Sequence, residues 1–294
     1  MDLRSVLMGL AFAFMWSSAF TSARMIVADA PPLTALSIRF LISGLIGVAI
    51  ARALGQTWHL SRGQWRSVAV FGLCQNALYL GLNFVAMQWV EASLAAIIAS
   101  TMPLLVALLG WMFWGQRVRP LGIAGLVAGF AGVAIIMGSR FSGGADMTGI
   151  IFCGIGALAL AVATLTVRGA SAQGNLLMVV GLQMFVGAGV LAIFAVALED
   201  WSVSWTLQLG LAFAYTTLVP GLIATWVWFR LVERIGAVRA ATYHFLNPFL
   251  GVAVAAALLS ERLGPADIVG VAIVAAGILA VQLSKESPMP IRAG

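Results

Sequence analysis

Three polar side chains recur at helical spacing inside an otherwise apolar stretch of the chain. Asn76, Tyr79 and Asn83 stand at positions i, i+3 and i+7, so one face of a helix carries all three. Amide and phenol groups offer hydrogen bonds to a polar molecule or to a neighbouring helix. Because three bulky polar groups exceed what contact between helices needs, we interpret this face as the wall of a cavity.

Polar clusters interrupt three further apolar stretches. They lie at 16–21, at 100–102 ahead of Pro103, and at 242–247 ahead of Pro248. Polar groups are rare inside a membrane unless they face protein or a water-filled cavity. For the serines and the threonine of the first cluster, hydrogen bonding between helices is an equally good interpretation. The candidate binding residues are Trp16, Ser17, Asn76, Tyr79, Asn83, Met102, Tyr243, His244 and Asn247.

Pro103 and Pro248 are expected near the middle of two membrane-spanning helices. Each lacks an N–H and so frees the carbonyl four residues earlier, at Ala99 and His244. We interpret both prolines as hinges, and the freed carbonyls as acceptors for a solute ammonium. The alternative is a static kink that serves packing alone.

His244 is the only titratable side chain expected near the membrane midplane. It either makes a hydrogen bond within the helix bundle or contacts the solute and titrates as the site changes its access to water. No Asp, Glu, Lys or Arg is expected near the midpoint of any span, although Arg39 lies within the second one. This pattern disfavours phosphate-bearing solutes, which need Arg or Lys, and coupling to protons or sodium through a buried carboxylate.

The sequence predicts neither an enzyme nor a metal protein. Catalysis needs paired carboxylates or a nucleophile with its base, and His59, the second of only two histidines, falls in a connection. Cys74 and Cys153 lie within apolar segments and have no second ligand at metal spacing. We therefore expect no metal and no cofactor.

Composition indicates which elements must position these residues. The chain is 62% apolar and 9% charged, too apolar for a water-facing surface. Ten stretches can each cross a bilayer core of about 30 Å as a helix. They lie near Val6–Val27, Leu33–Ala51, Val68–Val90, Ala92–Trp114, Leu121–Gly138, Met147–Val167, Leu176–Leu198, Leu207–Phe229, Ala237–Leu259 and Ala266–Leu283.

The last third of the chain repeats its middle. With Leu94–Met137 placed on Arg239–Gln282 without a gap, ten of the forty-four pairs are identical. The identities beyond aliphatic residues are Pro103 with Pro248, Arg117 with Arg262, Pro120 with Pro265, Gly125 with Gly270 and Gly132 with Gly277. Such a duplication is typical of transporters built from two related halves.

Five helices per copy is an odd number, so the two copies must enter the membrane from opposite sides. We therefore predict an all-α membrane protein whose ten transmembrane helices form two inverted five-helix repeats. The repeats are expected at residues 1–139 and 146–284, followed by a cytoplasmic tail at 285–294. The glycines Gly122, Gly125, Gly129 and Gly132 form a stripe that predicts close helix packing and no chemistry.

The cations of the connections predict the orientation. With both termini in the cytoplasm, twelve Lys and Arg residues lie inside and three lie outside. The inner set is Arg4, Arg52, Arg62, Arg66, Arg117, Arg119, Arg168, Arg230, Arg234, Arg239, Lys285 and Arg292, and the outer set is Arg24, Arg140 and Arg262. The net charge of +6 thus reflects topology and contact with anionic lipid, and implies no nucleic-acid partner.

Two segments resemble a known family. The first helix carries Trp16-Ser17-Ser18-Ala19-Phe20, and the last hairpin reads Leu259-Ser260-Glu261-Arg262-Leu263-Gly264-Pro265 before a Gly- and Ala-rich helix. Both resemble the ten-helix drug/metabolite transporter superfamily with two EamA-type halves, although the first half has Gln116-Arg117-Val118 where Glu-Arg-Leu is usual. The chain is most similar to the YddG-type bacterial amino-acid exporters.

The resemblance implies a bacterial inner-membrane transporter with a central cavity between helices one, three, four, six, eight and nine. Aromatic rings, hydroxyls, amides and one imidazole suit a neutral or zwitterionic solute, such as an aromatic amino acid or methionine. We expect a monomer that exports such solutes passively. The alternative is a broad exporter of hydrophobic or cationic compounds, because aromatic cavities also bind cations.

Overall fold

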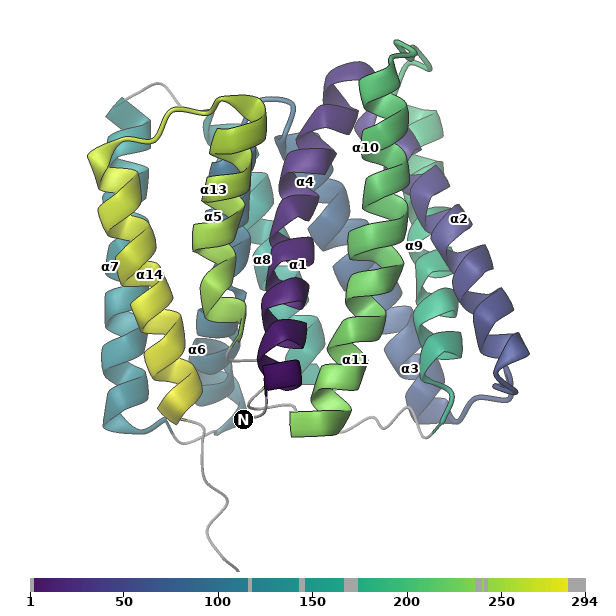
Figure 1. Ribbon diagram of the computed structural model, residues 1–294, viewed down its shortest axis with the longest axis horizontal. Helices are drawn as coiled ribbons and strands as arrows, with labels where there is room; N and C mark the ends of the chain where they lie inside the picture. The colour runs from purple at the N-terminus through teal and green to yellow at the C-terminus, as the bar shows by residue number, and fades with distance from the viewer. Residues whose placement is uncertain are drawn as a thin grey trace, which may run out of the picture.

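The computed structural model describes residues 3–115, 118–142, 146–166, 174–235, 240 and 243–284. Within these ranges the chain is helical and contains no strand. Nine of its helices are long and apolar enough to cross a membrane, and a shorter apolar helix covers Tyr243–Leu259. Figure 1 shows them side by side as one bundle. The predicted ten-helix architecture is confirmed.

The ten spans follow one another with short connections. In chain order they are α1 (Leu3–Asp29); α2 (Pro32–Ala53); α3 (Arg62–Phe71), η1 (Gly72–Leu80) and α4 (Gly81–Ala86); α5 (Ala92–Ser100) and α6 (Met102–Trp114); α7 (Pro120–Ser142); α8 (Met147–Thr166); α9 (Leu176–Leu198); α10 (Leu207–Leu218), η2 (Val219–Ile223) and α11 (Ala224–Ile235); η3 (Tyr243–Leu246) and α13 (Asn247–Leu259); and α14 (Pro265–Ser284). The predicted tail at 285–294 lies outside the described residues.

Glycines join the fifth and tenth spans in a symmetric contact. A Cβ placed on Gly125 of α7 would lie 2.7 Å from the carbonyl oxygen of Gly277 in α14, and one on Gly132 would lie 2.8 Å from that of Gly270. The repeat pairs Gly125 with Gly270 and Gly132 with Gly277. Gly125 therefore contacts the repeat partner of Gly132, and Gly132 contacts the repeat partner of Gly125. This is the contact that a two-fold relation between antiparallel helices produces. The predicted packing role of the glycine stripe is confirmed.

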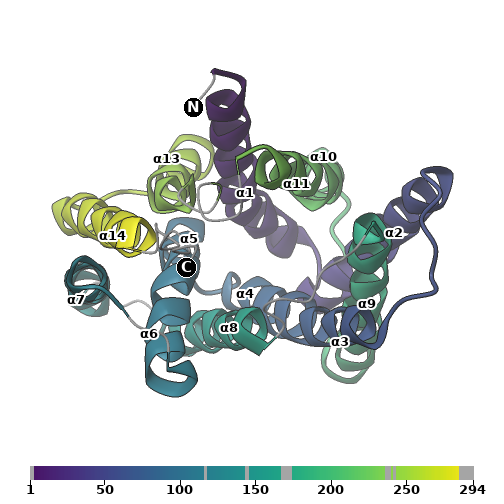
Figure 2. The same cartoon turned by 90° about the horizontal axis from the view of Figure 1, so that it is seen from below.

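The second and seventh spans form the corresponding antiparallel pair at the other end of the bundle. A Cβ on Gly44 of α2 would lie 3.1 Å from the carbonyl oxygen of Gly181 in α9. Farther along the pair, the Ser37 hydroxyl donates to the Ala188 carbonyl at 2.9 Å. The view along the bundle in Figure 2 places α2 with α9 and α7 with α14 at opposite ends. The two halves therefore run in opposite directions through the membrane.

Two carboxylates hold helix N-termini at one end of the bundle. Glu199, which follows α9, accepts from the backbone N–H groups of Leu33 and Thr34 at 2.6 and 2.8 Å. Glu261, which follows α13, accepts from those of Ala92 and Ser93 at 2.8 and 3.0 Å. Each carboxylate satisfies N–H groups that a helix cannot pair internally, and it complements the positive end of the helix dipole. The Glu-Arg-Leu hairpin, which joins the ninth and tenth spans, thus also binds the N-terminus of the fourth span.

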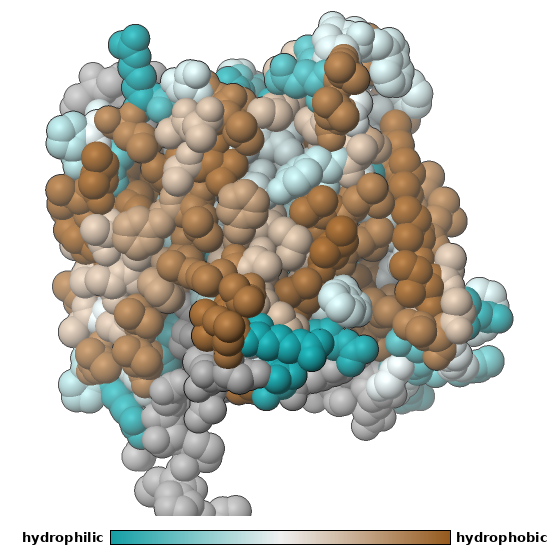
Figure 3. Space-filling view, in the orientation of Figure 1, coloured by the Kyte–Doolittle hydropathy of each residue, from teal (hydrophilic) through white to brown (hydrophobic). Residues whose placement is uncertain are grey.

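The outer surface is apolar over the flank of the bundle. Figure 3 shows apolar residues over most of this face and hydrophilic residues gathered near its ends. Exposed tryptophans lie near both ends, which suits the two interfaces of a bilayer: Trp58, Trp65, Trp111 and Trp226 at the end where α1 begins, and Trp89, Trp201 and Trp205 at the other. This distribution is that of a multi-pass membrane protein.

Each proline follows a local break in its span, and Pro103 lies at the middle of the fourth span, Ala92–Phe113, as predicted. Thr101 interrupts the fourth span, and Pro103 lies in the first turn of α6. A 3-10 turn, η3, precedes α13, and Pro248 lies in the first turn of that helix. Proline is tolerated there because a first-turn N–H has no partner inside the helix. The described part of the ninth span thus changes from a 3-10 turn to an α-helix at Asn247, and its predicted start at Ala237 lies outside the described residues.

The glycine contact between α7 and α14 predicts the effect of one added methyl group. Gly125→Ala should lower the thermal stability of the purified protein, because backbone must move to admit the Cβ, which costs about 1–3 kcal/mol. Gly154→Ala in α8 is the control, since nothing lies within 4 Å of its added Cβ. Melting temperatures in detergent measure both. Equal stability of the two variants would refute the contact.

Candidate functional site

A cavity of about 410 Å³ lies between the two halves. Ligand sites in proteins commonly measure about 300–1,000 Å³. The first, third, fourth, sixth, eighth and ninth spans contribute to its wall, as the family resemblance implies. The second span (α2) and the seventh span (α9) contribute as well. The cavity reaches Gln64 and Leu176, in the first turns of α3 and α9, at the end of the bundle where α1 begins.

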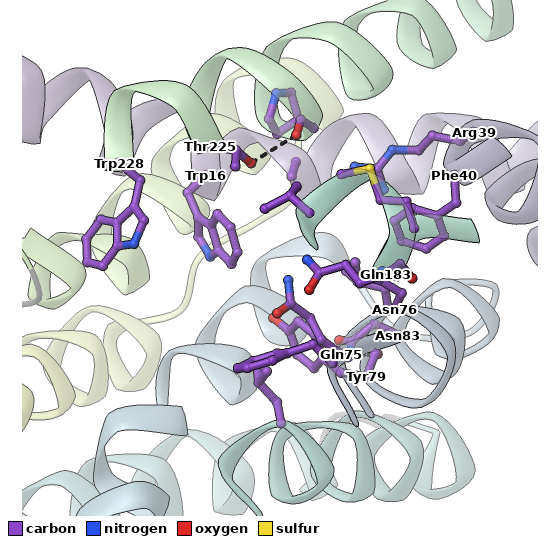
Figure 4. A pocket seen from close by; sticks show the side chains of 18 of the residues that line it. Trp16, Arg39, Phe40, Gln75, Asn76, Tyr79, Asn83, Gln183, Thr225 and Trp228 are labelled. Atoms are coloured by element: carbon purple, nitrogen blue, oxygen red, sulfur yellow. Dashed lines mark hydrogen bonds between the residues drawn. The ribbon is translucent and has the colours of Figure 1, made fainter. Parts of the chain in front are cut away.

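Aromatic rings make up one part of the wall. The ring of Phe12 lies 4.7 Å from that of Trp228 and 5.4 Å from that of His244, measured between centroids. Trp16 lies 5.8 Å from Phe12 on the same side. Figure 4 shows Trp16 and Trp228 next to each other at one side of the cavity. These side chains offer flat apolar faces on which an aromatic ring can stack.

Amides and a phenol make up the facing part. Gln75, Asn76 and Tyr79 of η1, Asn83 of α4 and Gln183 of α9 all line the cavity, and Figure 4 shows them grouped together. The Asn76 Nδ2 donates to the Gln183 carbonyl at 2.9 Å, and the Asn83 Nδ2 donates to the Tyr79 carbonyl at 2.7 Å. The face thus contributes to helix packing and to the cavity wall at once. The Oδ1 of Asn83 is buried and has no hydrogen-bond partner.

Two π-helical segments shape the wall. Both η1 in the third span and η2 in the eighth are π-helices, and these spans are repeat counterparts. A π-turn holds an extra residue and leaves some backbone carbonyls less regularly paired, which is why such segments are frequent at functional sites. Gln75, Asn76 and Tyr79 of η1, and Pro220 and Gly221 of η2, line the cavity. The sequence predicted a regular helix in both places.

The structure separates the predicted binding residues into two groups. Those that line the cavity are Trp16, Asn76, Tyr79, Asn83, Met102 and His244. Ser17, Tyr243 and Asn247 do not line it. The Ser17 hydroxyl donates to the Asn247 carbonyl at 3.3 Å, and the Tyr243 ring packs against Gly9 of α1. These three hold the first span to the ninth, so the packing interpretation applies to them.

His244 takes part in both the bundle and the cavity. Its Nδ1 lies 2.9 Å from the Nδ2 of Asn247. With the amide as donor, Nδ1 accepts, and the ring proton is on Nε2. The imidazole ring itself lines the cavity between Trp228 and Phe12. Asn247 is therefore a positioning residue for His244.

Arg39, which the sequence places within the second span, reaches the cavity. Its side chain is only 6% exposed and lines the cavity from α2. The guanidinium lies 5.1 Å from the centroid of the Phe40 ring, and its Nε has no hydrogen-bond partner. The sequence did not show that this long side chain lines the cavity, because its direction depends on the rotation of the helix.

Other lining residues were not predicted. Gln64, Gln75, Gln183 and Thr225 lie in the wall with Phe40. Gln183 carried a signal in the sequence, because it is the only amide or charged side chain of α9, Leu176–Leu198. Gln75 carried a weaker one, as the neighbour of Asn76.

Comparison with known proteins agrees with this geometry. The sequence model of the EamA-like transporter family matches residues 3–138 and again 147–283. The chain belongs to the EamA-like transporter family. The two matches correspond to the two halves that enclose the cavity.

Two transporters resemble the chain along nearly its whole length, and a third resembles about half of it. The uncharacterized transporter YvbV of Bacillus subtilis is 25% identical over 97% of this chain and 93% of its own. The uncharacterized inner membrane transporter YedA of Escherichia coli K12 is 27% identical over 95% of this chain and 91% of its own. The aromatic amino acid exporter YddG of Ancylobacter novellus is 29% identical over 47% of this chain and 48% of its own.

A solved crystal structure shares the EamA fold seen here. It superposes with a TM-score of 0.68 at 21% identity and covers 96% of this chain and 98% of that chain. The relatives are transporters, so this EamA protein is a multi-pass membrane transporter. Among the described residues, no three His, Cys, Asp or Glu side chains gather where a metal could bind.

The division between lining and packing residues predicts thiol reactivity. In a background without Cys74 and Cys153, Gln183→Cys and Thr164→Cys should react with a water-soluble thiol reagent several-fold faster than Ser17→Cys. The first two positions line the cavity, whereas Ser17 is 1% exposed and faces Asn247. Labelling rates of the purified variants measure this difference. Equal rates would mean that the cavity is closed to water.

Proposed function

We propose that this protein exports neutral or zwitterionic amino acids with aromatic or thioether side chains across the bacterial inner membrane. The observation that carries the proposal is the composition of the cavity wall. Aromatic rings lie on one side, amides on the other, and no Asp or Glu is present among the described lining residues. A solute with an apolar ring and a polar head group fits both sides.

The similarity to an aromatic amino acid exporter supports this substrate class. That relative matches about half of this chain. The aromatic side chains here, Phe12, Trp16 and Trp228, give a physical reason for the same preference, because stacked or edge-to-face rings contribute about 0.5–1.5 kcal/mol beyond the burial of area. The flexible thioether of methionine fits such a wall as well.

Broad export of hydrophobic cations is the second candidate. Tryptophan faces bind cations, and Trp16 and Trp228 supply two of them. The cavity nevertheless has a buried arginine and, among its described residues, no carboxylate. Repulsion by Arg39 in a medium of low dielectric constant therefore favours the amino acids.

Alternating access follows from the two halves. At the end opposite to the start of α1, Arg24 donates to the carbonyl of Met87 and links the first span to the third. If this contact opened and the spans closed around Gln64 and Leu176, the cavity would open to the opposite side of the membrane. The breaks ahead of Pro103 and Pro248 provide bending points at related positions of the two halves.

The proposal predicts which compounds compete for transport. In liposomes that contain the pure protein, labelled phenylalanine should enter by exchange against internal phenylalanine, and tryptophan and methionine should compete with it. Tetraphenylphosphonium should not compete, because Arg39 repels it. Competition by this cation together with failure of the amino acids would favour the second candidate. Protein-free liposomes are the control.

The charge distribution predicts which end faces the cytoplasm. Among the described connections and helix ends, Arg4, Arg52, Arg62, Arg66, Arg119, Arg230 and Arg234 lie at the end where α1 begins, whereas Arg24 and Arg262 lie at the other. Positive charge is retained in the cytoplasm.

A single cysteine at each end tests this orientation in whole cells. His59→Cys should resist a membrane-impermeant reagent, and Trp205→Cys should react, since both positions are exposed. Permeabilised cells, in which both positions should react, are the control. The reverse pattern would invert the topology and the direction of transport.

A further inference from the structure

Arg39 is a buried cation for which the described residues supply no counter-ion. Its Nε has no hydrogen-bond partner among them, and its side chain is 6% exposed inside the membrane-spanning part of α2. A charge in a medium of low dielectric constant is costly unless an anion and hydrogen bonds compensate it. The described lining residues include no Asp or Glu that could do so. The carboxylate of a bound solute would compensate this charge.

Arg39 and Gly221 line one part of the cavity wall, here called the recess, and Ser43 lies fully buried behind them. A Cβ placed on Gly221 of η2 would lie 3.4 Å from the Arg39 Nη2 and 3.5 Å from the Ser43 Oγ, so both groups meet at this glycine. The Ser43 hydroxyl is buried and also lacks a partner. A cation, a hydroxyl and the absence of a side chain on Gly221 thus converge at one place. Unpaired buried polar groups of this kind are rare in proteins and call for an explanation.

We propose that Arg39 binds the carboxylate of the transported solute. A guanidinium and a carboxylate form two parallel hydrogen bonds. Figure 4 shows Arg39 across the cavity from Trp228, so a solute held by its carboxylate directs its side chain toward the aromatic wall. The inference rests on the proposed function and names the chemical group that the site requires.

The surroundings of Arg39 should make the carboxylate of an amino acid more important for binding than its ammonium group. The carboxylate meets a full opposite charge. The ammonium meets only neutral acceptors among the described lining residues, such as the unpaired Oδ1 of Asn83. Loss of the carboxylate should therefore weaken transport far more than loss of the ammonium. A single guanidinium also suits a monoanionic carboxylate better than a phosphate dianion.

Three analogues of phenylalanine separate these requirements in wild-type protein. In the liposome exchange assay, 3-phenylpropionate, which lacks the ammonium, should compete with phenylalanine. Phenethylamine, which lacks the carboxylate, should not. Stronger competition by phenyl phosphate than by 3-phenylpropionate would make the recess a phosphate site and overturn the assignment.

Substitution of Arg39 tests the same point from the protein side. Arg39→Gln should raise the KM for phenylalanine at least about tenfold, as expected for the loss of hydrogen bonds to a charged group. Arg39→Lys retains the charge but not the planar guanidinium, so its KM should lie between those of wild type and Arg39→Gln. Arg66→Gln removes an exposed arginine of α3 and should behave like wild type.

Thermal stability separates a binding role from a structural one. Removal of an uncompensated buried charge should leave Arg39→Gln at least as stable as wild type, while phenylalanine no longer raises its melting temperature. A lower melting temperature with an intact response to phenylalanine would show that Arg39 serves packing against Phe40.

The outcomes distinguish the two proposals. If wild-type protein does not transport phenylalanine, the proposed function is wrong. If it does, but Arg39→Gln transports it equally well or phenethylamine competes as well as 3-phenylpropionate, only the role of Arg39 is wrong. Should Arg39→Gln fail to fold, the competition series and Arg39→Lys still decide.

Discussion

The hydrocarbon core of a bilayer offers no hydrogen bonds, and this constraint organises the whole molecule. Every polar group at membrane depth must find a partner in the protein or face an enclosed space. Ser17, Asn76 and Asn83 donate to backbone carbonyls within the bundle. The arginine of α2 and the amides of η1 and α9 face the cavity. The position of the polar groups therefore defines the solute path.

Two helix pairs pack closely through glycines, and the solute path lies between these pairs. The pairs α2–α9 and α7–α14 approach through Gly44 with Gly181 and through Gly125 with Gly277. In both pairs, backbone meets backbone and leaves no room for a ligand. The remaining spans, which include the π-helical segments η1 and η2, enclose the space between the two pairs together with side chains of α2 and α9. The duplication thus produces two tight contacts at the periphery and one cavity at the centre.

The sequence predicted the fold well, because the lengths of apolar stretches and the constant offset between repeats are direct consequences of bilayer thickness and duplication. It predicted Trp16, Asn76 and His244 in the cavity wall, since polarity at membrane depth is informative. It failed for Ser17, Tyr243 and Asn247, because polarity alone does not reveal whether the partner is another helix. The contact of Arg39 with the cavity was not predicted, because the direction in which a long side chain points depends on the rotation of its helix. The π-turns left no pattern in the apolar spacing.

A structure of the protein with a bound aromatic amino acid would test the central claim most directly. The claim is that the cavity between the inverted halves holds the solute by its carboxylate. Density for the solute should place its carboxylate within hydrogen-bond distance of the Arg39 guanidinium, with the ring against Trp16 and Trp228. A solute bound in the reverse orientation, or outside the space between the halves, would contradict the account.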